Sequence, residues 1–235
     1  MKLENNFVTA TLFLIFSSIS PLWAQIADGV YIADVENQRH ELKVANGYLI
    51  HSVYSEAPAK FIKTVGGFYE VQDDMLNVKL EFNSNHETDG VAELSIPIEK
   101  DAGKLLFKTT PELPFLQVDS LEQELDGAWL FATRGPDEGQ DRRGEENPRK
   151  TLKFLLDGRF QWIAYHTENM KFSGTGGGTF TSQDGIYTEN IEFFSRDNSR
   201  VGATLDFKYE LKGDDWHHKG KNSKGEPMYE IWARR

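Results

Sequence analysis

The side chains that could do chemistry gather in the later part of the chain. Glu189, His166 and His218 offer one carboxylate and two imidazoles. The four tryptophans beyond residue 24 lie in the same region, at Trp129, Trp162, Trp216 and Trp232. A carboxylate that orients an imidazole can move a proton by general acid–base chemistry. The same groups beside indole faces could instead hold a ligand with a polar head and an apolar body.

Several other kinds of site are disfavoured. The chain has no cysteine, which excludes disulfides, thiolate metal sites and cysteine nucleophiles. His217 and His218 are adjacent, so on a strand they face opposite sides, and we predict no metal site. The run from Gly174 to Gly178 lacks the Gly-Lys-Ser/Thr ending of a phosphate loop and is followed by no helix, which predicts a bulge or tight hairpin. No Gly-x-Ser-x-Gly motif points to a serine hydrolase, and no cofactor is predicted.

Composition describes a globular, acidic protein. The 235 residues include 26 Lys+Arg and 37 Asp+Glu, for a formal net charge of -11, and 39 % are hydrophobic. An acidic surface repels phosphate backbones and anionic lipid heads, so binding to nucleic acid or to a membrane surface is not expected.

The first 24 residues read as an export signal. The segment FVTATLFLIFSSI, residues 7–19, is apolar or small and uncharged, and it ends before Pro21-Leu22-Trp23-Ala24. It is too short to span a bilayer, which takes about 20 residues. We expect a Sec signal peptide cleaved after Ala24 and a secreted or periplasmic protein. A buried N-terminal strand or helix is the alternative. No later segment is long and apolar enough to insert in a membrane.

The rest of the chain is a duplication. A shift of 111 positions aligns residues 60–99 with residues 171–210 without a gap, and 13 of the 40 pairs are identical. Chance would give about two or three. The repeat predicts two units, residues 25–118 and 119–235, that join near residues 119–126.

Both units read as β-strands. Apolar and polar residues alternate with period two in stretches such as residues 76–82 and 203–211. Asn46-Gly47 and Asp157-Gly158 lie between alternating runs, which is a strong hairpin signal. With about eight strands per unit, closure would remove the unpaired edges. The predicted fold is all-β, with two tandem up-and-down antiparallel barrels; a pair of open sandwiches is the alternative.

The second unit resembles a known domain type. It opens with Gly127-Ala128-Trp129, contains Gly177-Gly178-Thr179-Phe180 and Gly213-Asp214-Asp215-Trp216, and ends with residues 225–232 (GEPMYEIW). This order resembles the lipocalin-like (calycin) domains of uncharacterised secreted bacterial proteins. The resemblance implies an up-and-down barrel that binds small hydrophobic or amphipathic molecules. The first unit departs from it, because Tyr31 and Leu105 stand where the second has Trp129 and Trp216.

The duplication also serves as an internal control. Residues of one strand parity should point inward in both copies, and in the first copy they are almost all hydrophobic. The second copy has Glu189 where the first has Val78, and His218 where the first has Phe107. Trp162 and His166 likewise replace His51 and Ser55. The same parity places Phe82 and Phe193 inward, and it places Glu230, Trp232 and Arg234 outward.

These substitutions define the predicted site. A lone buried carboxylate costs several kcal/mol, so Glu189 should meet His218, His166, Tyr229 or water. Arg196, in the polar loop 195–200, could grip an anion at the barrel mouth. The predicted ligand-binding residues are Trp129, Trp162, His166, Glu189, Arg196, Trp216, His218 and Tyr229.

Three functions are open at this stage. The leading hypothesis is a secreted protein that binds a small amphipathic or sugar-derived ligand in a cavity of the second barrel. The alternatives are an extracellular enzyme that uses Glu189 with His218 or His166, and a structural module of the cell envelope without a ligand. The charged stretch 134–150, absent from the first copy, is either a lid over the barrel mouth or a mobile insertion.

Overall fold

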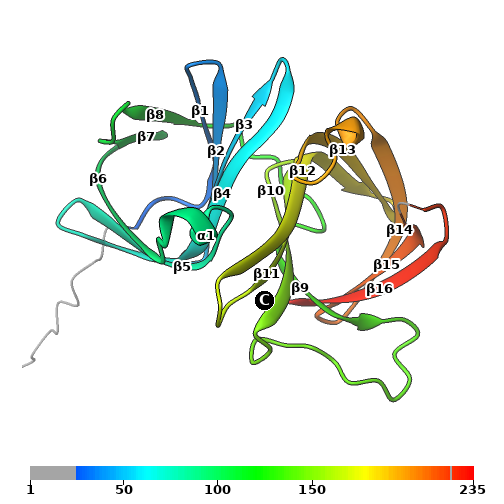
Figure 1. Cartoon of the computed structure of the whole chain (residues 1–235). Coiled ribbons are helices and arrows are strands. Elements are labelled where there is room, and N and C mark those ends of the chain that lie inside the picture. Colours follow the sequence, from blue (N-terminus) through cyan, green and yellow to red (C-terminus); the bar gives the residue numbers. More distant parts are fainter. Residues whose placement is uncertain (1–24, 223) are drawn as a thin grey trace, which may run out of the picture.

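Two closed β-barrels follow one another along the chain (Figure 1). The computed structural model describes residues 25–222 and 224–235. The predicted signal peptide, residues 1–24, lies outside the described residues. Within the described part of the chain, no helix is long and apolar enough to cross a membrane.

The first barrel is antiparallel throughout and closes where its last strand pairs with its first. Its strands are β1 (Gly29–Val35), β2 (Gln38–Ala45), β3 (Tyr48–Glu56), β4 (Ala59–Gln72), β5 (Met75–Asn83), β6 (Glu93–Asp101), β7 (Lys104–Phe107) and β8 (Leu113–Gln117). A one-turn helix, α1 (His86–Asp89), lies between β5 and β6.

The second barrel repeats this order and closes by pairing of β16 with β9. Its strands are β9 (Gly127–Arg134), β10 (Arg149–Leu156), β11 (Arg159–His166), β12 (Lys171–Gln183), β13 (Ile186–Phe194), β14 (Thr204–Lys212), β15 (Asp215–Lys221) and β16 (Pro227–Arg234). A 3₁₀ turn, η1 (Asn198–Arg200), follows β13. The predicted all-β fold with two tandem barrels is confirmed.

The two predicted hairpins form at equivalent places. Asn46 and Gly47 have φ of 53° and 74°, and Asp157 and Gly158 have φ of 48° and 72°. Positive φ at both central residues suits a two-residue turn between twisted strands, and Asn, Asp and Gly tolerate it best. Local sequence therefore sets the β2–β3 and β10–β11 connections.

Each barrel has a bulge at the same glycine pair. The register shifts between Gly66 and Gly67 in one barrel and between Gly177 and Gly178 in the other. A Cβ on Gly178, where φ is +158°, would lie 2.0 Å from the carbonyl oxygen of Asn190. The pairing skips Glu81 on β5 and Glu192 on β13, so the extra residue lies opposite the glycine pair and not in the glycine run. The run was predicted to be a bulge or a tight hairpin; it is instead the part of β12 that faces a bulge, where a side chain would block the close approach of β13.

The bulge corrects one prediction. Phe82 and Phe193 were expected inside their barrels, but both lie outside, at the contact between the barrels. Phe82 packs on Tyr165 with ring centroids 5.0 Å apart, and Phe193 packs on Tyr54 at 4.5 Å. The extra residue in the bulged strand reverses the alternation beyond it, which simple parity misses.

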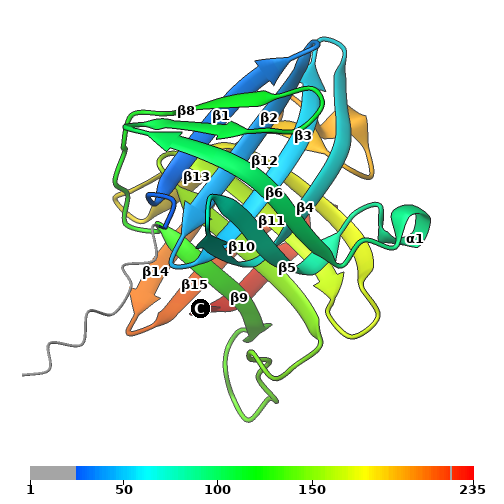
Figure 2. The same cartoon turned by 90° about the vertical axis from the view of Figure 1, so that its left-hand side faces the viewer.

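The barrels pack side by side through matching outer walls, formed by β3–β5 and β11–β13 (Figure 1). Figure 2 looks along the line that joins the barrels, with the first barrel in front of the second. The two aromatic contacts just described exchange places under the 111-residue shift. Phe61 and its counterpart Phe172 stack on each other with centroids 6.3 Å apart and planes 7° apart. The interface therefore has approximate twofold symmetry, as between two copies of one subunit.

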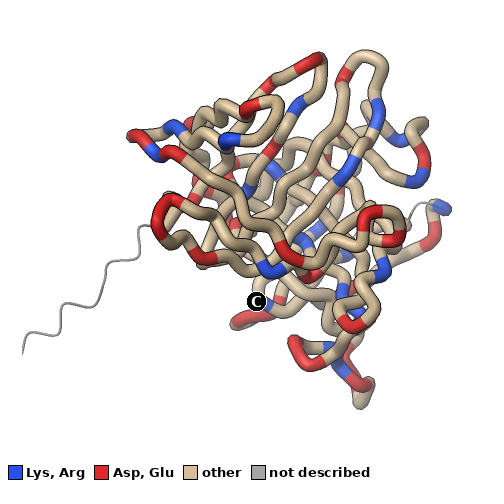
Figure 3. The backbone as a smooth tube through the Cα atoms, turned by 60° about the vertical axis from the view of Figure 1, so that its left-hand side comes forward, with Lys and Arg blue, Asp and Glu red and all other residues tan. Residues whose placement is uncertain are grey.

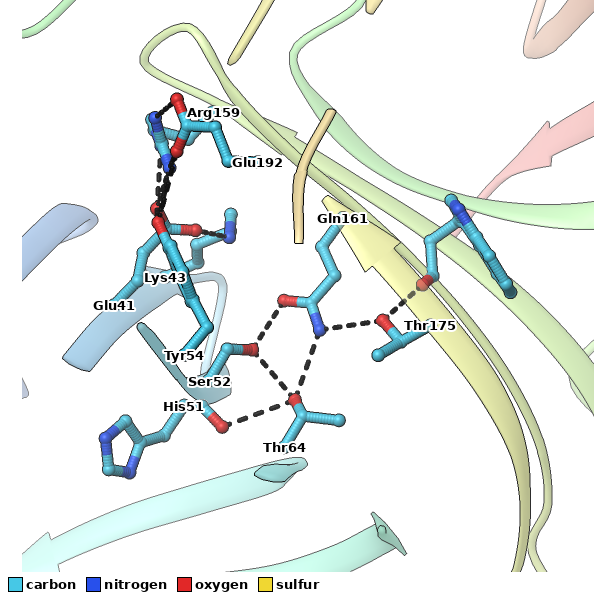
Figure 4. Close-up of polar contacts among 11 residues, drawn as sticks. Glu41, Lys43, His51, Ser52, Tyr54, Thr64, Arg159, Gln161, Thr175 and Glu192 are labelled. Atoms are coloured by element: carbon cyan, nitrogen blue, oxygen red, sulfur yellow. Dashed lines mark hydrogen bonds and ion pairs between the residues drawn. The ribbon is translucent and has the colours of Figure 1, made fainter. Parts of the chain in front are cut away.

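Buried polar side chains fix the alignment of the two walls (Figure 4). At the centre Gln161, fully buried, accepts a hydrogen bond from Ser52 at 2.8 Å. Its amide nitrogen donates to the equivalent threonines Thr64, at 3.1 Å, and Thr175, at 3.0 Å. A second barrel that slid along the first would leave these groups unsatisfied, at a cost of about 1–3 kcal/mol each.

A charged cluster lies beside this centre (Figure 4). Glu41 is fully buried and contacts Lys43 of its own strand and Arg159 of the other barrel. Burial alone would raise the pKa of Glu41, but the charges of Arg159 and Lys43 outweigh it and lower that pKa to about 2. Arg159 also bonds Glu192 at 2.9 Å, while Arg235 bonds the equivalent Glu81 at 2.8 Å. An arginine thus holds the carboxylate on each side of the interface.

Charged residues of both signs are interspersed along the chain. Figure 3 shows Lys and Arg scattered among Asp and Glu over both barrels and their loops. Two charged residues, Lys153 and Glu189, are buried inside the second barrel.

Candidate functional site

A buried ion pair crosses the interior of the second barrel. Lys153 Nζ, on β10, donates to Glu189 Oε1, on β13, over 2.8 Å. The two residues are 6 % and 5 % exposed. Both lie on inward positions of their strands, so closure of the barrel brings them together. The pairing meets the need of each buried charge for a partner.

Four aromatic rings surround the ammonium group of Lys153. Its Nζ lies 4.8, 4.9, 5.3 and 5.8 Å from the ring centroids of Tyr187, Trp216, Trp232 and Phe207, respectively. A cation within about 6 Å of an aromatic face is attracted by the ring quadrupole. The aromatic interior is therefore compatible with a positive charge.

Two more titratable side chains face the same space. His218 and Glu230 are cross-strand partners on β15 and β16. His218 is 1 % exposed, and neither of its ring nitrogens has a hydrogen-bond partner. Burial, and then the charge of Lys153, hold the pKa of His218 well below its usual value, so the ring is neutral. Burial also raises the pKa of Glu230, although Lys153 acts against it.

The first barrel has hydrophobic residues at all four places. The polar residues, here called the polar floor, are Lys153, Glu189, His218 and Glu230. Their counterparts, in the same order, are Leu42, Val78, Phe107 and Leu113. The first three follow from the 111-residue shift; the fourth follows because Leu113 pairs with Phe107 as Glu230 pairs with His218. All four counterparts are 6 % exposed or less, so the first barrel is filled where the second is polar.

A cavity of about 530 Å³ lies over the polar floor and opens at one end of the barrel. This volume is within the range of about 300–1,000 Å³ that is usual for small-molecule sites. Its walls are largely apolar and include Trp162, Ile191, Phe194, Leu205, Phe207 and Met228. Its rim is charged or polar and includes Arg196, Asp197, Arg200, Lys221 and Asn222.

Half of the predicted ligand-binding residues line this cavity. They are Trp162, Glu189, Arg196 and His218. Trp129 and Trp216 are fully buried, with ring centroids 5.7 Å apart, and they pack in the core without lining the cavity. His166, at the end of β11, does not line the cavity either.

Tyr229, one of the alternative partners considered for Glu189, does not contact it. Its hydroxyl lies 2.8 Å from Nδ1 of His217, on the side of β15 opposite to His218. The adjacent histidines do point to opposite sides, as predicted from strand geometry. The partner that Glu189 finds is Lys153.

The last strand also corrects the sequence reading. Trp232 and Glu230 were expected on the outside, but Trp232 is 3 % exposed and Glu230 lines the cavity. Trp232 pairs with Trp216, and Glu230 pairs with His218. Because directly opposed residues share a face of the sheet, both follow their partners inward.

The geometry does not form the predicted carboxylate–imidazole pair. The hydrogen bond of Glu189 goes to an ammonium group, and both nitrogens of His218 are unpartnered, as is Nδ1 of His166. The described residues also contain no group of three His, Asp or Glu side chains that could hold a metal ion.

Sequence reasoning missed Lys153 and Glu230. The signal for Lys153 was present, because the same 111-residue shift that flags Glu189 places Lys153 opposite Leu42. Glu230 had no such signal, because the last strands of the two units do not align under the 111-residue shift. Its counterpart emerges only from strand pairing.

The long insertion lies against the barrel wall. Arg142 bonds Asp215 at 2.9 and 2.6 Å, and the guanidinium of Arg143 lies 4.9 Å from the ring centroid of Phe131. None of residues 135–150, all of them described, lines the cavity. In this arrangement the insertion does not act as a lid.

Comparison with known proteins adds one finding. Residues 124–235, which comprise the second barrel, match the model of a family described as a domain of unknown function (DUF4488). No curated protein matches the chain.

Proposed function

We propose that the second barrel binds a small amphipathic molecule, such as a sugar-headed amphiphile, in the cavity over its polar floor. One observation carries the proposal: four buried hydrophobic positions of the first barrel are polar in the second, beneath an open cavity of about 530 Å³. Buried polar groups cost stability unless they gain partners. A ligand head group would supply partners to His218, while the apolar walls would receive the ligand's body.

The proposal can be tested by filling the cavity. The variant Lys153→Leu/Glu189→Val/His218→Phe/Glu230→Leu gives the second barrel the hydrophobic residues that the first barrel has at these four positions. Native mass spectrometry of protein from its own host would show any co-purified molecule, and quenching of Trp162 would follow titration with octyl glucoside. We expect both signals for the natural protein and neither for the variant.

Two further variants guard against loss of folding. Met228→Trp places a larger side chain in the wall and so narrows the cavity, but it leaves the polar floor unchanged. This variant should also weaken octyl glucoside binding. His217→Phe makes the matched change on the other side of β15 and should leave binding unchanged. Equal binding by the natural and filled proteins would overturn the proposal.

We also propose that the protein works outside the cytoplasm, as a lipocalin-like carrier or sensor. The uncharged apolar stretch at residues 7–19 and the small residue Ala24 support export. Cell fractionation with N-terminal sequencing tests this: a periplasmic or extracellular chain that begins at Gln25 is expected, and a cytoplasmic chain that keeps residues 1–24 contradicts it.

A further inference from the structure

The polar floor has more carboxylates than cations. Lys153 is its one lysine and already pairs with Glu189 at 2.8 Å. Glu230 lines the same cavity, and it forms no ion pair with any described residue. Arg134 lies opposite Glu230 on β9, but the two side chains form no ion pair. A ligand that brings one positive charge could therefore bind this second carboxylate directly.

The hydrogen-bonding groups of the floor also suit a donor. A neutral imidazole has one acceptor nitrogen, and both nitrogens of His218 lack a partner in a site that is 1 % exposed. Since His218 and Glu230 are directly opposed on neighbouring strands, their side chains lie about 5 Å apart at the Cβ atoms. One ammonium group, with three N–H donors, could bond both.

The surrounding walls are compatible with a cation. Phe207 already lies 5.8 Å from the ammonium of Lys153, and its ring centroid is 4.4 Å from that of His218. A second ammonium group beside His218 would therefore also lie near an aromatic ring.

An anionic head group is a poorer match. On the floor it would meet Glu189 and Glu230, while Lys153 is already engaged. The rim carries the cations Arg196, Arg200 and Lys221, but an anion bound there would leave the second carboxylate of the floor without a cation. The guanidinium group of Arg196 also donates a hydrogen bond to the carbonyl oxygen of Ser173 at 2.7 Å.

From this juxtaposition we propose that the cavity selects amphiphiles with a primary ammonium head group, which donates hydrogen bonds to Glu230 and His218. The inference rests on the ligand site proposed above and names the chemical class of its ligand. Burial raises the pKa of Glu230, so its carboxylate is the one that a bound cation would keep ionised.

The test compares three octyl compounds that differ only in the head group: octylamine, octanoate and octyl glucoside. Binding to the full chain is followed by tryptophan fluorescence and by calorimetry at pH 7.5. We expect octylamine to bind at least about tenfold more tightly than octanoate. Glu230→Gln should weaken octylamine binding by about 10- to 100-fold and change octyl glucoside binding little. Glu210→Gln, on the outer face of β14, makes the same charge change as a control.

Acidification supplies an independent readout. The charged and titratable groups that face Glu230 are Lys153 on β10, Glu189 on β13, Arg134 on β9 and His218 on β15. As the pH falls through the raised pKa of Glu230, its carboxyl group is protonated and the attraction for octylammonium is lost. Octylamine affinity should fall from pH 7.5 to pH 5 in the natural protein, and less in Glu230→Gln.

The outcomes separate the two proposals. Tighter binding of octanoate, or unchanged octylamine binding in Glu230→Gln, overturns the ammonium inference and leaves the ligand site standing. If Arg196→Gln then weakens octanoate binding, the head group is an anion at the rim. Binding of none of the three compounds at millimolar concentration overturns both proposals.

Discussion

The ion pair between Lys153 and Glu189 should respond very differently to one substitution than to two. Glu189→Val leaves a buried ammonium without its hydrogen-bonded partner. Lys153→Leu leaves Glu189 and Glu230 in one interior with no cation between them. The double variant Lys153→Leu/Glu189→Val instead installs the residues that the first barrel already packs at these places, Leu42 and Val78, which are 0 % and 2 % exposed.

The expected magnitudes follow from this burial. The two side chains are 7 % and 6 % exposed, so solvent screens the pair little. Removal of one partner of a buried pair costs about 3–5 kcal/mol, whereas replacement of both by apolar residues is neutral or stabilising by about 1–4 kcal/mol. We expect the cost of Glu189→Val to lie near the lower end of this range of about 3–5 kcal/mol, because Glu230 and the aromatic rings remain near the ammonium group. The cost of Lys153→Leu should lie near the upper end.

Urea unfolding at pH 7, followed by tryptophan fluorescence, measures these changes in the free energy of unfolding of the second barrel. The four tryptophans beyond residue 24 all lie in the second barrel, so the signal reports on that barrel. The double variant should be at least as stable as the natural protein. A loss in the double variant equal to the sum of the single losses would refute the reasoning, as would a Glu189→Val variant of unchanged stability.

Two other substitutions test the scaffold. Gly178→Ala should lower the free energy of unfolding by at least about 3 kcal/mol, because its Cβ would meet a carbonyl oxygen at 2.0 Å. Gly213→Ala, also at positive φ but in open space, should cost only about 1–2 kcal/mol; equal losses in urea melts would contradict the bulge argument. Arg235→Ala removes the bond to Glu81 at the interface and should cost about 1–3 kcal/mol, against almost nothing for the exposed Lys224→Ala. Equal melting temperatures for Arg235→Ala and Lys224→Ala would rule out a structural role for Arg235.

Some features of the site could be read from the sequence because they depend on local order. Period-two alternation placed Glu189, His218 and Trp162 inside the barrel, and the duplication marked the first two as departures from a hydrophobic pattern. The turns at Asn46-Gly47 and Asp157-Gly158 follow from residue types that accept positive φ.

Strand parity predicted the wrong side for some residues where a strand contains a bulge. It also failed in the last strand, where pairing with the neighbouring strand determines which side chains point inward. The bulges turned Phe82 and Phe193 toward the other barrel, and pairing with β15 turned Trp232 and Glu230 inward. The interface was harder to predict from the sequence. Gln161 and Arg159 have the pattern of exposed polar strand residues, and only the packing of the other barrel buries them.

The amino-acid sequence by itself determined the two barrels, their equivalence and the unusual polarity of the second interior, because alternation and turn chemistry act over a few neighbouring residues. Only the tertiary structure decided that Glu189 meets Lys153 and not an imidazole, and that the two barrels lock wall to wall. Those contacts join residues far apart in the chain, and their geometry depends on how eight strands close into a ring and how two rings then pack.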